Sequence, residues 1–300
     1  MNFNELVCFC KDLSIGFEID GKTAPLTSIK VGGSAKLIAH PSNIQDLCDL
    51  IAVLNKNSFK YCIIGNGSNV YFCDHYNGVV IVTDKINNIS VADRFLTAEC
   101  GASILSCARM SLFHSLSGLE FAYGIPGTIG GALYMNAEAF GSRFSDIVYK
   151  SIAFNIENNT LIELYNDEQL FSSKSSIFSK NRNYILLKTV LALNKNEFEN
   201  IKALMLTNMK KRSDTQPLNL PNAGSAFKRN NGIIPSKLID QIGLKGYRIG
   251  GIEISKKHAG FFVNSGDATA EDINELLAYI KMRIFTEFKV KLEEEIIYIK

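Results

Sequence analysis

Hydrophobic and polar positions follow helical spacing in some segments of the chain and strand spacing in others. From Ile44 to Lys56 the apolar residues recur every three to four positions, which predicts an amphipathic helix. Tyr61 to Ile64 is a short apolar run that stops at Gly65, and this predicts a strand that enters a loop. The run from Gly78 to Thr83 predicts a second strand. The first third of the chain is therefore expected to alternate short helices and strands.

The same reading predicts elements as far as the C-terminus. Strands are expected at Ile89–Ala98, Ser151–Asn155, Thr160–Leu164, Tyr184–Leu193 and Val290–Ile299. Helices are expected at Ile104–His114 and Lys195–Arg212, the second of which is long and polar. Helices and strands mixed in this way predict the α+β class.

A fourth helix is predicted near the C-terminus. Thr269 and Asp272 have the spacing of a capping box, in which each side chain bonds the backbone of the other residue. One apolar face follows and consists of Ile273, Leu276, Leu277, Ile280 and Ile284. We therefore expect a helix that begins just after Thr269 and packs on a core.

The main predicted domain boundary lies near Asn194, where the character of the sequence changes. The segment before it alternates short elements, whereas the segment after it opens with a polar helix and the turn-rich stretch Gln216–Gly224. The predicted division is 1–85 and 86–194 for two lobes of a nucleotide-binding part and 195–300 for a second domain.

Composition and charge exclude several classes of protein. The 300 residues are 46% hydrophobic and 21% charged, and 32 basic against 30 acidic residues leave a net charge of +2. Nothing in that balance calls for nucleic acid or an anionic membrane, so any anion site must be local. Neither a signal peptide nor an apolar run of roughly 18 residues is present, which predicts a cytoplasmic protein without a membrane span. Seven cysteines without a CxxC pair predict reduced thiols and no metal site.

A first glycine-containing loop follows the strand expected at Tyr61–Ile64, and its residues are Gly65, Asn66, Gly67, Ser68 and Asn69. Glycine lets a backbone approach a phosphate closely. Val70 stands where a dinucleotide fingerprint has its third glycine, and no helix pattern follows. The loop taken alone remains either a ligand loop or a polar turn.

A second cluster is denser, with four glycines, a proline and a threonine between Gly124 and Gly131. Such a run cannot be helix or strand throughout. Apolar residues flank it on both sides, so the loop is expected to be buried, and buried N–H groups need partners. A bound diphosphate would supply them, and a tight bend between packed elements is the alternative.

Six strings together resemble one enzyme family, that of UDP-N-acetylenolpyruvoylglucosamine reductase. They are IKVGGSA (29–35), GNGSN (65–69), GLEFAYGIPGTIGGALYMNA (118–137), TQPLNLPNAGSAFK (215–228), GLKGYRIGG (243–251) and KHAGFFVN (257–264). They follow the family's order over nearly the whole chain. Composition and periodicity alone lead only to a two-domain α+β enzyme that binds a nucleotide.

The resemblance implies a two-lobed FAD-binding domain of the vanillyl-alcohol-oxidase type, followed by a C-terminal α+β domain that closes over the substrate. It implies that NADPH reduces the flavin, which then reduces the enolpyruvyl ether of UDP-N-acetylglucosamine to UDP-N-acetylmuramate, a peptidoglycan precursor. The short segment between Gly246 and Gly260 resembles the shorter subtype, which lacks a tyrosine loop. The family is often monomeric.

The resemblance also assigns two catalytic residues, Ser225 and Glu295. Ser225 stands in the Ala-Gly-Ser motif as the proton donor, and Glu295 stands in Leu-x-x-Glu-Ile as the conserved carboxylate. Hydride addition to the vinyl group leaves a carbanion-like carbon that must receive a proton. Without the resemblance, Ser225 is a polar turn residue and Glu295 is an exposed charge at a strand edge.

One motif departs from the family. Its Tyr-Arg-x-Ser-x-Phe pattern aligns with Ser173-Lys174-Ser175-Ser176-Ile177-Phe178, so Lys174 is expected in place of the arginine that faces the substrate carboxylate. Lysine keeps the positive charge and loses the planar fork of donors. A solvated lysine in a serine-rich loop is the alternative.

The remaining candidates come from motif positions. For FAD they are the loop Gly65 to Asn69 with Gly124, Thr128, Ile129, Gly130, Gly131 and Asn136. For the UDP part of the substrate they are Arg212, Gln216, Lys228, Lys245 and Tyr247. His258 is expected to be structural. Two other hypotheses stay open, a different flavoenzyme on the same fold and a flavin-binding protein whose chemistry was lost at Lys174.

Overall fold

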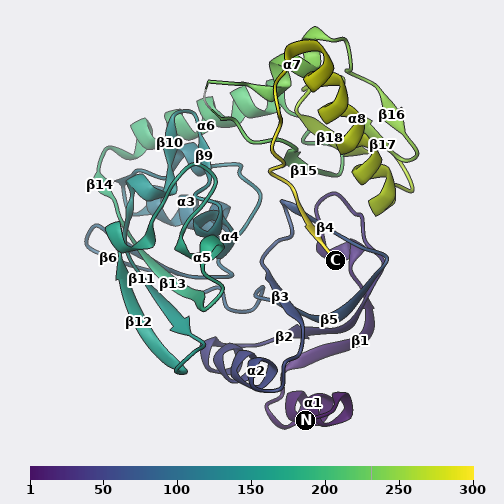
Figure 1. Ribbon diagram of the computed structural model, residues 1–300. Coiled ribbons are helices and arrows are strands. Elements are labelled where there is room, and N and C mark those ends of the chain that lie inside the picture. Colours follow the sequence, from purple (N-terminus) through teal and green to yellow (C-terminus); the bar gives the residue numbers. More distant parts are fainter. Residues whose placement is uncertain (231) are drawn as a thin grey trace. The chain divides into compact units, whose positions relative to one another are not determined.

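The computed structural model describes residues 1–230 and 232–300, which fall into two compact units (Figure 1). Unit 1 comprises Met1–Ile19, Leu37–Asn66 and Gly78–Lys211, and unit 2 comprises Asp20–Lys36, Gly67–Asn77 and Arg212–Lys300. Both contain helices and sheets, which confirms the predicted α+β class. The division at residues 85 and 194 stays a prediction.

Two larger sheets carry most of unit 1. The first has the order β1 (Gly16–Lys22), β2 (Ser34–His40), β5 (His75–Val82), β3 (Tyr61–Ile64), and the ends of its first three strands continue into unit 2. The second has the order β12 (Thr160–Tyr165), β11 (Val148–Asn155), β13 (Tyr184–Ala192), β7 (Phe95–Glu99), β6 (Ile89–Ala92). Two short pairs join β8 (Leu116–Ser117) to β14 (Asn194–Lys195) and β9 (Glu138–Ala139) to β10 (Ser142–Arg143).

The helices of unit 1 are α1 (Phe3–Asp12), α2 (Ile44–Lys56), α3 (Ile104–Phe113), α4 (Ile129–Tyr134), α5 (Ile177–Lys180) and most of α6 (Phe198–Thr215). Helix α2 has the predicted bounds, and its buried face packs with β2 and β5 side chains in one core. Helix α6 begins three residues later than predicted, because Lys195 belongs to β14.

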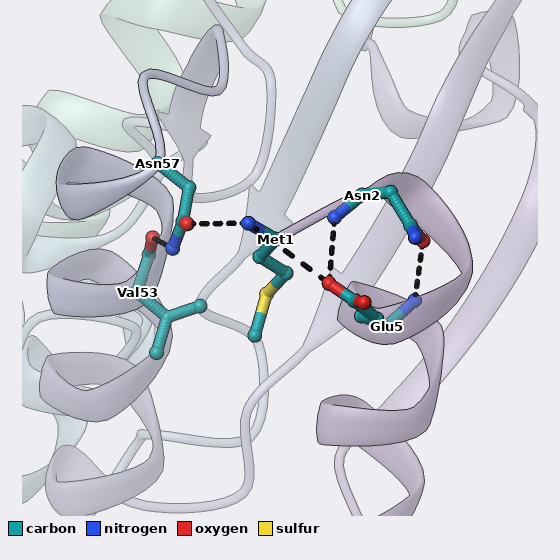
Figure 2. Close-up of polar contacts among 5 residues, drawn as sticks. All are labelled: Met1, Asn2, Glu5, Val53 and Asn57. Carbon is teal, nitrogen blue, oxygen red and sulfur yellow. Dashed lines mark hydrogen bonds and ion pairs between the residues drawn. The ribbon is translucent and has the colours of Figure 1, made fainter.

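Helix α1 was not predicted, although its capping box is present in the sequence. The Asn2 side chain accepts a hydrogen bond from Glu5 N, and Asn2 N donates to Glu5 Oε2 at 2.8 Å (Figure 2). The Met1 ammonium donates to Asn57 Oδ1 at 2.9 Å, just after α2. These contacts tie the start of α1 to the end of α2 and let Leu6 and Cys10 enter the core.

The strand expected over Ile89–Ala98 is a hairpin. Strands β6 and β7 pair antiparallel through a tight turn at Asp93, whose φ of 50° lies in the left-handed region. Aspartate tolerates this region, so a turn can form here without a glycine. The alternation of apolar and polar residues continues on both sides of Asp93 and therefore gives no sign of the turn. The single-strand interpretation was therefore wrong.

Unit 2 is built around a sheet with the order β15 (Asn222–Ser225), β18 (Phe261–Asn264), β17 (Ile252–Ile254), β16 (Arg248–Ile249). Its helices are α7 (Pro235–Gln241) and α8 (Ala270–Phe288). The capping box of Thr269 and Asp272 is present as predicted, with Asp272 N donating to Thr269 Oγ1 at 3.1 Å. The apolar face of α8 is buried and shares a core with Ile252, Ile254 and Phe262 of the sheet.

The predicted strand over Val290–Ile299 is shorter in the structure. Only β19 (Ile297–Ile299) forms ladder pairs, and it runs parallel to β4 (Val70–Phe72). Glu294 forms an isolated bridge to Phe227. Leu292 and Ile296 are buried as the alternation predicts, but the residues between them find no continuous partner strand among those that the structure describes.

Candidate active site

The two glycine loops touch within unit 1. A Cβ atom built on Gly65 would lie 2.1 Å from Thr128 Oγ1 and 2.8 Å from Thr128 Cγ2. No real side chain tolerates such distances, so only glycine fits at residue 65. Thr128 is buried and caps α4, with its Oγ1 accepting a hydrogen bond from Gly131 N at 3.3 Å. Residues more than 60 positions apart in the sequence therefore form one close contact.

The second loop satisfies several of its N–H groups from the protein itself. Ile125 N donates to Ala122 O at 2.9 Å, Ile129 N to Ala102 O at 2.9 Å, and Gly130 N to Cys100 O at 2.8 Å. The loop is also half-buried rather than buried, and Gly131 is exposed. A Cβ on Gly130 would lie 2.8 Å from Cys100 O, so this glycine serves close packing. The N–H groups of Ile125, Ile129 and Gly130 do not need a ligand.

The rest of the first loop belongs to unit 2. Gly67 has a φ of 57°, and a Cβ there would lie 1.9 Å from Leu26 O. The Asn69 side chain donates through Nδ2 to Glu295 O at 2.9 Å, and Ile297 N donates to Asn69 O at 2.9 Å. A candidate FAD loop is therefore bonded directly to the segment that carries a candidate catalytic carboxylate.

Ser225 and Glu295 lie on adjoining segments of unit 2. Ser225 ends β15, where it pairs with Phe261, and Glu295 N donates to Ala226 O at 2.8 Å. The neighbouring bridge joins Phe227 to Glu294. Both candidate catalytic side chains are half-buried. The backbone bonds hold these two residues in register, although 70 positions separate them.

Lys174 lies in unit 1 at a tight turn. Ser172 N donates to Ser175 O at 2.9 Å, and Lys174 itself has a φ of 54°. Its side chain is only 13% exposed, and its Nζ lies 3.8 Å from Glu138 Oε1. This burial and this ion pair do not fit a solvated lysine.

Asn136, a predicted FAD residue, uses both ends of its side-chain amide within unit 1. Its Nδ2 donates to Ser172 O at 3.1 Å, and its Oδ1 accepts from Ser145 N at 3.0 Å. The residue is 2% exposed.

The five predicted substrate residues lie in unit 2, and two of them meet. Arg212 donates through Nη1 to Gln216 Oε1 at 3.1 Å, and burial lowers the pKa of the Arg212 guanidinium. Tyr247 stacks on Tyr279 of α8 with ring centroids 4.5 Å apart. Lys245 pairs with Asp240, and Lys228 pairs with Glu293. Three of the five are therefore engaged with protein partners outside the predicted set.

Two carboxylates were missed by sequence reasoning. Glu138 is the ion-pair partner of Lys174. Glu120 is 5% exposed, and its Oε2 accepts from Gly118 N at 2.7 Å, while its Oε1 has no hydrogen-bond partner among the residues that the structure describes. Glu120 stands between Leu119 and Phe121 in an apolar run, and that setting was the available signal. Glu138 carried no signal, since its partner is 36 residues away.

Three further features bear on chemistry. Burial raises the pKa of the thiols of Cys100 and Cys107 to about 12, which makes both poor nucleophiles. Over 1–230 and 232–300, no group of three His, Cys, Asp or Glu side chains is placed to hold a metal ion. In the same ranges no helix has the length and apolarity that crossing a membrane requires.

Two family models match the chain. The model described as "FAD binding domain" matches residues 35–154, and the one described as "UDP-N-acetylenolpyruvoylglucosamine reductase, C-terminal domain" matches residues 216–299. Among solved structures, UDP-N-acetylenolpyruvylglucosamine reductase from Thermus caldophilus aligns with a TM-score of 0.80 at 26% identity, over 95% of this chain and 99% of that one. An alkyldihydroxyacetonephosphate synthase aligns with a TM-score of 0.51 at 15% identity, over 65% of this chain and 41% of that one, a likeness of fold alone. The predicted FAD-binding fold is confirmed.

Curated relatives agree over almost the full length. A protein named UDP-N-acetylenolpyruvoylglucosamine reductase from Caldanaerobacter subterraneus subsp. tengcongensis is 41% identical over 90% of this chain and 89% of its own. One of the same name from Caldicellulosiruptor bescii is 39% identical over 98% of this chain and 94% of its own. By these matches, the chain is an FAD-dependent oxidoreductase that belongs to the UDP-N-acetylenolpyruvoylglucosamine reductase family.

Proposed function

We propose that this chain uses NADPH and bound FAD to reduce UDP-N-acetylenolpyruvoylglucosamine to UDP-N-acetylmuramate, in the synthesis of peptidoglycan precursors. One observation carries the proposal. Ser225 and Glu295, which the family resemblance assigns to catalysis, lie on segments joined by the 2.8 Å bond from Glu295 N to Ala226 O. A different flavoenzyme on the same fold has no need for this pair. We place the reaction in the cytoplasm, where NADPH is regenerated, and expect a monomer.

The residues present fit an FAD group. The contact of Gly65 with Thr128 brings the two loops of unit 1 together, and Gly131 is exposed. Backbone without side chains is what a diphosphate needs for close approach. We propose that Gly65, Asn66, Gly124 and Thr128 to Gly131 are cofactor-binding residues, and that Gly67 to Asn69 are as well. The chemistry that bound FAD would supply there is hydride transfer from NADPH to the substrate.

Ser225 is the proposed proton donor. Reduction of the vinyl group adds hydride at one carbon and a proton at the other, and a hydroxyl placed at the second carbon can supply that proton. Glu295 is held next to the Ser225 strand by its own backbone N–H and by Asn69, so its carboxylate is positioned to handle protons or charge beside the serine. The backbone bond from Glu295 N to Ala226 O supports this pairing of roles.

Cationic side chains are the proposed anchors of the substrate. Lys174 replaces the family arginine at the enolpyruvyl carboxylate, whose negative charge grows as hydride is added. Arg212 with Gln216 forms the proposed diphosphate contact, with Lys228, Lys245 and Tyr247 as further contacts. Burial lowers the pKa of Arg212, yet a guanidinium stays protonated in proteins, so the charge is retained.

A single-turnover experiment tests the proposal. The purified flavoprotein is reduced with NADPH without oxygen, the enolpyruvyl nucleotide sugar is added, and flavin absorbance is followed. We expect fast reoxidation in the wild type and a loss of about 10²–10⁴-fold in Ser225→Ala, with reduction by NADPH unchanged. The control is Ser42→Ala at an exposed serine, which should reoxidise at the wild-type rate. A wild-type flavin that NADPH bleaches but this substrate cannot reoxidise would refute the proposed function.

A further inference from the structure

Three contacts connect residues 134–138 to the turn that carries Lys174. Ser176 Oγ donates to Tyr134 O at 3.1 Å, Asn136 Nδ2 donates to Ser172 O at 3.1 Å, and Lys174 Nζ lies 3.8 Å from Glu138 Oε1. The partners in the first segment are alternate residues, of which Tyr134 ends α4 and the other two follow it. One short segment therefore contacts the lysine turn at three places, namely Ser172, Lys174 itself and Ser176.

The turn needs such support, because its conformation is unfavourable on its own. Lys174 has a φ of 54°, a region that residues with a Cβ seldom occupy. Such a backbone persists only where the surrounding structure over-determines it. The contacts from Tyr134 and Asn136 supply that constraint on the backbone, and Glu138 acts on the side chain.

The supporting segment is itself fixed. Glu138 begins β9, which pairs with β10 in register Glu138 to Arg143 and Ala139 to Ser142. Asn136 Oδ1 accepts from Ser145 N just beyond β10, so one buried amide bonds both the hairpin and the lysine turn. Because both ends of the Asn136 amide bind backbone in unit 1, its side chain acts as a connector.

A lysine in place of an arginine requires this kind of positioning. Its ammonium is a point charge on a flexible four-carbon stem, without a planar fork that sets its own direction. At 3.8 Å the contact with Glu138 lies beyond hydrogen-bond range, so it attracts the ammonium without itself using one of the ammonium's N–H donors. A carboxylate at this distance can set the direction in which the ammonium points.

We propose that Glu138 and Asn136 are positioning residues for Lys174, with Glu138 directing its ammonium and Asn136 holding its turn. The proposal rests on the proposed function, in which Lys174 faces the substrate carboxylate. It replaces a cofactor-binding role for Asn136 with one in the reduction of the substrate.

A double-mutant cycle tests the role of Glu138. Glu138→Gln, Lys174→Met and the double variant are compared in the rate at which the substrate reoxidises the reduced flavin. We expect Glu138→Gln to slow this step by about three- to tenfold and Lys174→Met by roughly 100-fold, with the double variant no slower than Lys174→Met. Reduction by NADPH and flavin content should not change. The matched control is Glu163→Gln, which breaks the ion pair of unit 1 between Lys150 and Glu163 at 2.9 Å and should leave the step unchanged.

The proposed role of Glu138 is overturned if Glu138→Gln slows reoxidation of the flavin by the same factor in the Lys174→Met background as in the wild type. It is also overturned if Glu138→Gln reoxidises at the same rate as the control. A normal rate for Lys174→Met also overturns it while leaving the reductase activity in place. A wild type that the substrate cannot reoxidise refutes the proposed function instead, so the two failures are distinguishable.

Asn136→Asp tests the second residue separately. Aspartate keeps an oxygen for Ser145 N and loses the N–H donor to Ser172 O. We expect a full flavin content and a reoxidation step slowed by about tenfold or less. Loss of flavin from this variant would show that Asn136 is a cofactor-binding residue, and a wild-type rate would show that the bond to Ser172 positions nothing.

Discussion

The two regions that carry the candidate chemistry are assembled by different physical means. In unit 1, Gly65 can lie against Thr128 because glycine has no side chain. A single methyl group at residue 65 would overlap Thr128. In unit 2, Ser225 and Glu295 are brought together by backbone hydrogen bonds, which do not depend on either side chain. The first region is fixed by steric fit and the second by pairing of the main chain.

This difference decides what a substitution reports. A change at the glycine contact alters the position of both loops, so it tests assembly of the proposed cofactor-binding region. A change at Ser225 or Glu295 leaves the bonds from Glu295 N to Ala226 O and from Ile297 N to Asn69 O in place, so it tests chemistry. Side-chain variants in unit 2 are therefore the cleaner probes of mechanism.

The largest effect is expected from Gly65→Ala, which breaks the steric contact. The new methyl group would overlap Thr128 Oγ1 and Cγ2, and the loops must separate at a cost of about 1–3 kcal/mol. We expect the purified variant to lose most of its flavin, measured by the ratio of flavin to protein absorbance. Gly16→Ala is the control, because its nearest contact is the flexible end of Lys85 at 3.3 Å.

A second-site change sharpens this prediction. Thr128→Ala removes the two atoms nearest the new methyl group, so Gly65→Ala with Thr128→Ala should regain part of the flavin lost by Gly65→Ala alone. Full flavin content in Gly65→Ala would mean that steric fit does not assemble this region, and the contrast with unit 2 would be lost.

Local features of the fold could be predicted from the sequence, because short-range patterns determine them. The bounds of α2, the strand at Tyr61–Ile64 and the capping box of Thr269 with Asp272 all follow from spacing within a few residues. Helix α1 had an equally local signal in Asn2 and Glu5 that was not used. The turn at Asp93 was missed because alternation continues through it.

Long-range pairings could not be predicted in this way. The parallel pairing of β19 with β4 joins residues more than 200 positions apart, and no local pattern encodes a partner. The same holds for the bond of Asn69 to Glu295 O and the ion pair of Lys174 with Glu138. The family resemblance named the candidate residues, and the structure added the contacts that place them within each unit.

A smaller effect is expected from Asn69→Ala, which weakens the frame of unit 2 without touching the proposed proton donor. The variant loses the bond from Asn69 Nδ2 to Glu295 O, worth about 1 kcal/mol. We expect the substrate step to slow by about three- to tenfold and reduction by NADPH to be normal. Asn87→Ala, which removes a comparable 2.8 Å bond to Asp84 O in unit 1, should leave the substrate step unchanged. Equal effects of the two variants would contradict a special role for the Asn69 bond.

The smallest expected effect is a pH dependence of the free energy of unfolding, caused by His258, which lies in the hydrogen-bonded segment next to Ser225. Ala226 N donates to Gly260 O at 2.9 Å, and Gly260 N donates to His258 Nδ1 at 3.1 Å, so this imidazole must offer an unprotonated nitrogen. Burial first, and then Arg229 and Lys245, lower the pKa of His258 below its usual 6.5, against opposing contributions from a backbone hydrogen bond and from Asp240.

The sign of the pH dependence follows from which state takes up the proton first. As pH falls below about 6.5, His258 is protonated in the unfolded chain before it is protonated in the folded chain. The free energy of unfolding should therefore decrease from pH 6.5 down to the lower folded pKa and then level off. Urea unfolding of the wild type and of His258→Gln between pH 7.5 and 5 measures the free energy of unfolding at each pH. In the variant this free energy should depend less steeply on pH. His114→Gln, at an exposed histidine, should keep the wild-type slope. Identical slopes in the wild type and His258→Gln would mean that protonation of His258 does not weaken the Ser225 frame.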